Sequence, residues 1–116
     1  MKVLKIMEKA EKLANLSPHR HKLGAIIARQ GKIIGKGWNK VDRGVSLYEG
    51  YWKGSCHAEI SALLDAKCDV AGSSIFVVRR NRRLSAPCST CRAILQEAGI
   101  KRAYYFNDGE IVKEKL

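Results

Sequence analysis

One segment of the sequence, residues 56–91, limits the possible folds and chemistries of the chain more than any other. It carries a His-Ala-Glu motif that begins at His57 and a Pro-Cys-Ser-Thr-Cys motif that ends at Cys91. One histidine and two cysteines are ligands that zinc accepts, and three protein ligands leave a fourth position for water, as in catalytic zinc sites. Glu59 lies two residues after His57 and can accept a proton from that water. The fold must therefore bring the two motifs to one point.

The size and composition of the chain indicate a single domain in a reducing compartment. A chain of 116 residues has the usual size of one domain, so we expect residues 1–116 to form a single domain. No long apolar run resembles a membrane span, and the charged residues near the start leave no apolar core for a signal peptide. We therefore expect a cytoplasmic protein, in which the four cysteines favour a metal-binding or catalytic role over disulfides.

The formal net charge of +11 has two interpretations. An excess of Lys and Arg keeps a protein soluble, or it creates a field that attracts phosphate-bearing substrates such as nucleotides and polynucleotides. The most basic cluster, at residues 79–83, reads Arg-Arg-Asn-Arg-Arg and is expected to lie in a loop. Charge alone does not choose between the two interpretations.

The pattern of apolar residues predicts an α/β fold. Helical spacing covers residues 2–15, 57–67 and 88–98, whereas short β-rich runs cover residues 24–28, 32–39, 73–78, 102–106 and 111–112. Turns are expected at residues 30–31 and 107–109, and residues 40–55 are expected to form a long loop. Strand-helix-strand units favour parallel neighbours in one sheet that carries helices on its faces.

The two motifs lie at the predicted starts of two helices that follow the same edge of the sheet. Their N-termini can therefore lie side by side, and a helix N-terminus favours thiolate over thiol because it carries partial positive charge. Cys88 and Cys91 are three residues apart, so both can face one point on the first helical turn. This arrangement suits zinc, which binds thiolates.

Each motif alone has a simpler interpretation. A Cys-x-x-Cys pair can be a redox pair or half of a structural zinc site, and a single histidine is usually packed or at the surface. A redox pair is expected soon after the first strand of its domain, whereas this pair comes late. A structural site needs a fourth ligand at a short spacing from His57, and the adjacent Cys56 has the wrong spacing. The combination of the motifs is far more specific than either motif.

Four motifs together resemble the zinc-dependent cytidine/deoxycytidylate deaminase superfamily over nearly the whole chain, and they occupy residues 35–39, 57–60, 87–91 and 98–101. The resemblance implies a three-layer α-β-α fold, in which a five-stranded mixed sheet has helices on both faces. It implies zinc held by His57, Cys88 and Cys91. It also implies Glu59 as the catalytic proton shuttle and Asn39 near the base or the sugar.

This assignment implies a hydrolytic mechanism. Zinc lowers the pKa of a bound water, and Glu59 accepts the proton of that water and delivers it to a ring nitrogen. Hydroxide then adds to the ring carbon that bears the amino group. Glu59 next protonates the leaving amine, so that ammonia departs.

Different features resemble different members of the superfamily. The His-Ala-Glu motif resembles deoxycytidylate and tRNA adenosine deaminases, since free-nucleoside deaminases commonly have Cys in place of that His. Ala86 stands where tRNA adenosine deaminases usually have Glu, and residues 79–85 are an insertion that those enzymes would not need. The predicted C-terminal hairpin resembles free-nucleoside deaminases, because too few residues are available for a crossover to a parallel strand.

We expect the substrate to be a small cytosine nucleotide or nucleoside, and the net charge favours deoxycytidylate. The expected substrate contacts are Asn39, Ala58, Arg79, Arg80 and Pro87. Further candidates for contact with a phosphate or the substrate are His19, Arg20, His21, Arg82 and Arg83. For the arginines, the alternative is a solvated basic loop.

Two other functions stay open. One is deamination of a base in single-stranded nucleic acid, such as tRNA adenosine or DNA cytosine, with Tyr48, Tyr51 and Trp52 stacking on the base. The other is a non-catalytic zinc-binding module, although Glu59 argues against it because a zinc site does not need Glu59 as a ligand. The resemblance also implies a homo-oligomer. A membrane partner is not expected, and a nucleic-acid partner is not favoured.

Overall fold

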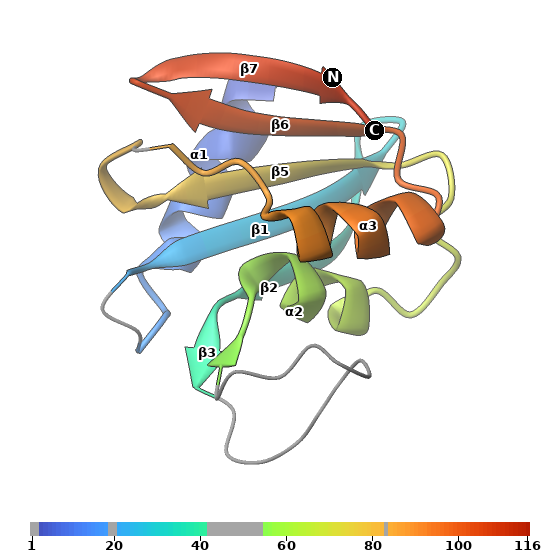
Figure 1. Ribbon diagram of the computed structural model, residues 1–116, viewed down its shortest axis with the longest axis horizontal. Coiled ribbons are helices and arrows are strands. Elements are labelled where there is room, and N and C mark those ends of the chain that lie inside the picture. The colour runs from blue at the N-terminus through green and yellow to red at the C-terminus, as the bar shows by residue number, and fades with distance from the viewer. Residues whose placement is uncertain (1–2, 19–20, 42–54, 83) are drawn as a thin grey trace.

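The computed structural model describes residues 3–18, 21–41, 55–82 and 84–116. Its centre is a five-stranded sheet with the strand order β2-β1-β5-β6-β7 (Figure 1). The strands of this sheet are β1 (Leu23–Arg29), β2 (Lys32–Trp38), β5 (Ser74–Arg79), β6 (Arg102–Asn107) and β7 (Glu110–Lys115). The helices are α1 (Val3–Ala14), α2 (Ala58–Asp65) and α3 (Ser89–Glu97). Two short strands, β3 (Lys40–Val41) and β4 (Ser55–Cys56), form a separate antiparallel pair.

The sheet is mixed, as predicted. β1 pairs antiparallel with β2 and β5, β5 pairs parallel with β6, and β6 pairs antiparallel with β7. Both predicted turns are confirmed: φ is 52° at Gln30, 79° at Gly31, 51° at Asp108 and 80° at Gly109, as tight hairpins require. The expectation of parallel neighbours is correct for β5 and β6. It is wrong for β2 and β5, because β1 lies between these two strands.

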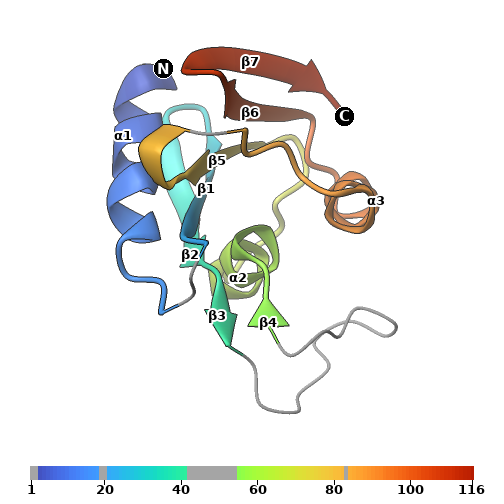
Figure 2. The same ribbon diagram turned by 60° about the vertical axis from the view of Figure 1, so that its left-hand side comes forward.

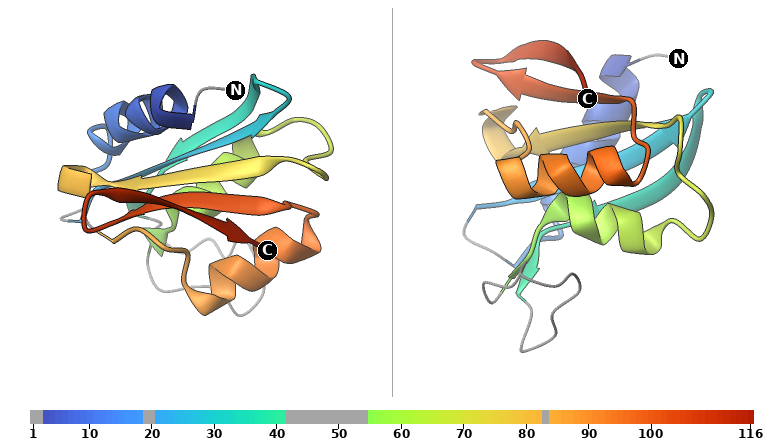
Figure 3. Two further views of the ribbon diagram at one scale, coloured as in Figure 1. Left: turned by 90° about the horizontal axis from the view of Figure 1, so that it is seen from above. Right: turned by 45° about the vertical axis from the view of Figure 1, so that its right-hand side comes forward.

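Helices cover both faces of the sheet, so the three-layer architecture is confirmed. Figures 2 and 3 show α1 on one face and α2 with α3 on the other. Successive residues of β1 and β5 point to opposite faces and enter two separate cores. The core beneath α1 contains Ile6, Met7, Ala10, Ile26, Ala28, Phe76, Val78 and Phe106. The core beneath α2 and α3 contains Ala25, Ile27, Ala58, Ala62, Val70, Ile75, Val77, Leu95, Ile100, Ala103 and Tyr105.

The two predicted loops are more regular than expected where the structure describes them. Arg79 is the last residue of β5, and the single helical turn η1 (Arg80–Arg82) follows it. The ends of the predicted loop at 40–55 pair as β3 and β4, whereas residues 42–54 lie outside the described residues. In the described part of the chain, the helices are too short or too polar to cross a membrane.

Close contact between the helices and the sheet depends on glycine. A Cβ atom on Gly24 would lie 2.0 Å from the carbonyl oxygen of Ala10 in α1. A Cβ atom on Gly37 would lie 2.5 Å from the backbone nitrogen of Ala62 in α2. Real Cβ atoms do not approach backbone atoms so closely, so these glycines set how near α1 and α2 lie to the sheet.

Gly37→Ala is expected to lower the free energy of unfolding by about 1–3 kcal/mol, because the added methyl group overlaps the backbone of α2. Urea denaturation followed by circular dichroism measures this change. Lys36→Ala, at an exposed position of the same strand, is the matched control and is expected to change stability by less than about 0.5 kcal/mol. If Gly37→Ala were as stable as the wild type, this glycine would not set the distance between α2 and the sheet.

Candidate active site

The two sequence motifs meet at the N-termini of α2 and α3. His57 is the N-cap residue of α2, Cys88 is the N-cap residue of α3, and Cys91 lies in the first turn of α3. The candidate ligand atoms of these three residues all lie within 4.8 Å of one another. Nδ1 of His57 is 3.4 Å from Sγ of Cys91. The predicted convergence of the two helix starts is therefore confirmed.

The three side chains fit a zinc ion in chemistry and in spacing. Zinc–ligand bonds of about 2.0–2.3 Å at tetrahedral angles separate a nitrogen ligand from a sulfur ligand by about 3.5 Å. The observed separation is 3.4 Å. Sγ of Cys88 accepts a hydrogen bond from the backbone N–H of Cys91 at 3.4 Å, at the end of α3 that carries positive partial charge. One histidine and two cysteines can thus hold a metal ion and leave one position for water.

Glu59 lies in the first turn of α2 beside these residues. Its side chain is buried, with only 4% of the residue exposed. Burial raises the pKa of the Glu59 carboxyl above its ordinary value, while hydrogen bonds from its own backbone N–H and with Cys91 oppose the shift. A buried carboxyl with a raised pKa is suited to accepting and returning a proton.

A cavity of about 420 Å³ opens beside this cluster. Its volume lies in the range of small-molecule sites, about 300–1,000 Å³. The residues that line it are His21, Leu23, Asn39, His57, Ala58, Glu59, Arg79, Leu84, Ser85, Ala86 and Cys88. His21 is exposed and Arg79 is partly exposed, whereas Glu59 is buried. His21 and Arg79 therefore belong to the rim, and Glu59 belongs to the interior.

Three of the predicted substrate contacts line the cavity, namely Asn39, Ala58 and Arg79. Arg80 does not, because it follows the end of β5 in the turn η1 and lines a separate hollow beside α1. Pro87, which is buried directly before Cys88, is also absent from the cavity wall.

Of the further candidates, His21 reaches the cavity and Arg82 does not. Nδ1 of His21 lies 2.7 Å from Nη2 of Arg79. Arg82 lies 3.5 Å from the carboxylate of Glu11 in α1, and its guanidinium lies 5.1 Å from the centre of the Phe106 ring. The other candidates lie outside the described residues: His19, Arg20, Tyr48, Tyr51, Trp52 and Arg83.

Asn39 joins the end of β2 to the segment that precedes β1. Its Oδ1 accepts a hydrogen bond from the N–H of Leu23 at 2.9 Å, and its Nδ2 donates to the carbonyl of His21 at 2.5 Å. The hydroxyl of Ser17 donates to the backbone carbonyl of Asn39 at 2.7 Å. Asn39 therefore fixes His21 and Leu23 in the cavity wall, in addition to lining the cavity itself.

Four residues of the cavity wall were not expected from the sequence, namely Leu23, Leu84, Ser85 and Ala86. Ser85 is the most informative of them, because it is buried between the ends of β5 and β6. Its hydroxyl donates to the carbonyl of Val77 at 2.9 Å and accepts from the N–H of Phe106 at 3.2 Å. A single serine outside any motif gives no sequence signal for such a contact.

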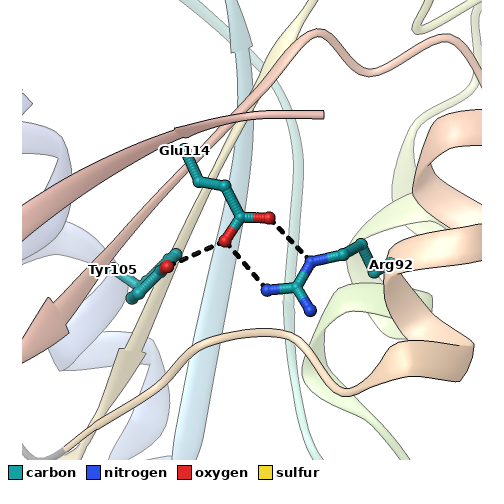
Figure 4. A network of polar contacts seen from close by, with 3 residues as sticks. All are labelled: Arg92, Tyr105 and Glu114. Carbon is teal, nitrogen blue, oxygen red and sulfur yellow. Dashed lines mark hydrogen bonds and ion pairs between the residues drawn. The ribbon is translucent and has the colours of Figure 1, made fainter.

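Arg92, which directly follows Cys91, anchors the first turn of α3 to the sheet. Its Nε and Nη2 donate to the Glu114 carboxylate on β7 at 2.7 Å and 2.9 Å (Figure 4). The hydroxyl of Tyr105 on β6 donates to the same carboxylate at 2.8 Å. The hydrogen bond from Tyr105 is the main cause that lowers the pKa of Glu114; burial opposes this shift and Arg92 adds to it. The C-terminal hairpin thus holds the helix that carries two candidate ligands.

Glu114→Gln is expected to lower the free energy of unfolding at pH 7 by about 1 kcal/mol, because the charge-assisted hydrogen bonds are weakened. The pKa of Glu114 is lower in the folded chain than the ordinary value of 4.5. The ionised Glu114 therefore contributes to the free energy of unfolding above pH 4.5. This contribution is lost as the pH falls through the pKa that Glu114 has in the folded chain. Urea denaturation at pH 7 and in acid measures the difference between the variant and the wild type.

Glu110→Gln is the matched control for this experiment, because Glu110 lies exposed on the same strand. It is expected to change stability by less than about 0.5 kcal/mol at either pH. A destabilisation by Glu114→Gln that stayed constant down to strongly acidic pH would contradict an ionic contribution of Glu114.

Comparison with known proteins agrees with the geometry of the cluster. A model of the cytidine and deoxycytidylate deaminase zinc-binding region matches residues 1–107. The deoxycytidylate deaminase of Homo sapiens is 30% identical over 96 residues, which cover 72% of this chain and 51% of that protein. The uncharacterized deaminase in luxG 3'region of Aliivibrio fischeri is 32% identical over 88 residues, which cover 71% of this chain and 56% of that protein. The chain thus spans about half the length of these relatives.

Two solved structures have the same fold. The dCMP deaminase from the cyanophage S-TIM5 has a TM-score of 0.74 at 30% identity, over 94% of this chain and 89% of that chain. A cytidine deaminase from Burkholderia pseudomallei has a TM-score of 0.74 at 24% identity, over 99% of this chain and 93% of that chain, and supports the fold alone. The family match covers most of the sequence, including the three converging zinc donors. The chain therefore belongs to the family of zinc-binding cytidine and deoxycytidylate deaminases.

Proposed function

We propose that the protein hydrolytically deaminates the cytosine base of a small nucleotide or nucleoside, of the deoxycytidylate or cytidine type, to the uracil form and ammonia. The observation that carries the proposal is the convergence of three zinc donors and the buried Glu59 beside one cavity. The choice of a nucleotide as substrate is supported by the similar phage dCMP deaminase, which has been crystallised in complex with dCMP and dUMP.

The zinc ion would be held by Nδ1 of His57 and by the thiolates of Cys88 and Cys91. Bound there, zinc would activate a water molecule for attack on the ring carbon that bears the amino group. The two helix N-termini favour this role, because they place positive partial charge beside both thiolates. The buried position of Cys91 keeps bulk water away from this part of the site.

Glu59 would move the protons of the reaction. It would accept a proton from the attacking water and deliver it to the ring nitrogen, and it would then carry the proton of the added hydroxyl group to the leaving amine. Burial supports this role in two ways. It raises the pKa of Glu59, and it keeps the carboxyl in the cavity interior next to the metal donors.

The cavity wall would orient the base. Ala58 stands between His57 and Glu59 in the sequence and lines the cavity wall. Its small side chain leaves room for a flat ring. Asn39 uses its Oδ1 and one hydrogen of Nδ2 within the protein, so the second hydrogen can be donated to the base or the sugar. Leu23 and Leu84 supply apolar surface to the same wall.

A substrate panel tests this proposal. The purified, zinc-loaded chain is incubated with cytidine, deoxycytidine, deoxycytidylate, guanine, a single-stranded DNA oligonucleotide and a tRNA anticodon stem-loop. Ammonia release and chromatography of the bases are measured. We expect turnover of the cytosine monomers. Turnover of the polymers alone would contradict the proposal, and binding of zinc without any turnover would point to a non-catalytic module.

A further inference from the structure

Within the described part of the basic cluster, Arg79 is the arginine that reaches the cavity. The alternation of the strand explains why. Val77 belongs to the core beneath α2 and α3, and Val78 belongs to the core beneath α1. Arg79 is two residues after Val77 and therefore points to the face of α2 and α3, where the cavity lies.

Arg79 is held at the rim by His21. Arg79 lies opposite Leu23 in the register of β5 and β1, so the segment before β1 runs directly past it. Nη2 of Arg79 lies 2.7 Å from Nδ1 of His21. A guanidinium group can only donate, so Nδ1 of His21 is the acceptor of this hydrogen bond. Asn39 in turn fixes the backbone of His21 at 2.5 Å.

The charge of Arg79 is not balanced by a neighbouring acid in the described residues. Arg82 pairs with Glu11 and Arg92 pairs with Glu114, whereas no described carboxylate lies within ion-pair distance of Arg79. Among the described residues of the cavity wall, Glu59 is the single acid, and it is buried. The rim therefore carries a positive charge that a bound anion can neutralise.

We propose that Arg79, positioned by His21, binds the 5′-phosphate of the substrate, so that the enzyme prefers a nucleoside monophosphate to a free nucleoside. This inference rests on the proposed function, which supplies the cytosine base that enters the cavity. One N–H of the guanidinium is used by His21, and the others can form charge-assisted hydrogen bonds to phosphate oxygens. Arg79 is the contact residue, and His21 is a positioning residue.

The first test compares Arg79→Met with Arg80→Met. Both variants remove one positive charge, but Arg80 faces the separate hollow beside α1. We expect Arg79→Met to lower kcat/KM for deoxycytidylate about 10- to 100-fold and to change kcat/KM for deoxycytidine less than about threefold. Arg80→Met is expected to leave both values within about threefold. Equal losses on the two substrates, or equal effects of the two variants, would overturn the proposal.

The second test examines His21. His21→Leu removes the acceptor for Arg79, whereas His21→Asn keeps an acceptor at a similar distance from the backbone. We expect His21→Leu to raise KM for deoxycytidylate several-fold with little change in kcat, and His21→Asn to restore most of the loss. A purely structural role of His21 would affect deoxycytidine equally and would not be rescued by Asn.

Binding measurements separate this inference from the proposed function. Calorimetry measures the affinity of the wild type and Arg79→Met for deoxycytidylate, deoxycytidine and a single-stranded DNA oligonucleotide. Tighter binding of deoxycytidylate than of deoxycytidine, lost in Arg79→Met, supports the inference even if no substrate is turned over. Equal affinity for deoxycytidylate and deoxycytidine would overturn it, as would an effect of Arg79→Met on the oligonucleotide alone. Circular dichroism confirms that each variant is folded.

Discussion

Glu59→Gln is expected to lower kcat for cytosine deamination about 10²- to 10⁴-fold, which is the usual contribution of a positioned acid–base group. The amide has nearly the shape of the carboxylate but cannot carry the proton between water, ring nitrogen and leaving amine. Zinc content is expected to stay at the wild-type level, because Glu59 is not one of the three converging donors. Steady-state kinetics and elemental analysis of the same preparation measure both quantities.

Glu97→Gln is the matched control for this variant. Glu97 lies exposed at the end of α3, and its replacement is expected to leave kcat within about twofold. Ordinary activity of Glu59→Gln would mean that another group moves the proton. A simultaneous loss of zinc would mean that Glu59 supports the metal rather than the proton transfer.

Cys91→Ser is expected to abolish stable zinc binding. The side chain is fully buried at the start of α3, so a serine fits the space, but its hydroxyl is a poor ligand in place of a thiolate. A metal that binds only the folded chain stabilises it by about 4 kcal/mol at a free concentration 1,000-fold above Kd. We therefore expect a lower melting temperature than that of the zinc-loaded wild type, measured by calorimetry together with zinc content.

Removal of zinc from the wild type by a chelator is expected to lower the melting temperature by most of the same amount. The same chelator is expected to leave the melting temperature of Cys91→Ser unchanged. Cys68→Ser is the matched control, because Cys68 is exposed and lies outside the cluster. The control should keep both the zinc and the chelator-sensitive melting temperature. Full zinc content in Cys91→Ser after dialysis would contradict the assignment of this thiolate as a ligand.

Much of the fold and of the metal cluster was predictable, because local patterns determine them. Apolar periodicity predicts the three helices and the five strands of the main sheet, and the turn residues Gly31 and Gly109 predict the hairpins, where φ is positive in the structure. The convergence of His57 with Cys88 and Cys91 followed from helix starts at one edge of a sheet.

The substrate contacts were less predictable, because they depend on where a strand ends. Two valines precede Arg79, so alternation places Arg79 on the face of the cavity only if β5 continues to residue 79, and Arg80 then lies in the turn that follows. The sequence predicts a loop there instead, in which both Arg79 and Arg80 are expected contacts. Pairings between distant residues, such as Arg92 with Glu114, follow no local pattern and emerge only from the assembled fold.

The position of Ser85 has a consequence for how such a protein can diversify. Three hydrogen bonds attach Ser85 to the ends of β5 and β6, through Val77 and through both backbone polar groups of Phe106. They return the chain to the same place before Cys88, whatever path residues 80–84 take. Insertions or deletions in that segment can therefore accumulate without displacing the metal donors. We therefore expect changes in this segment to alter the cavity wall at Leu84 without a loss of metal affinity.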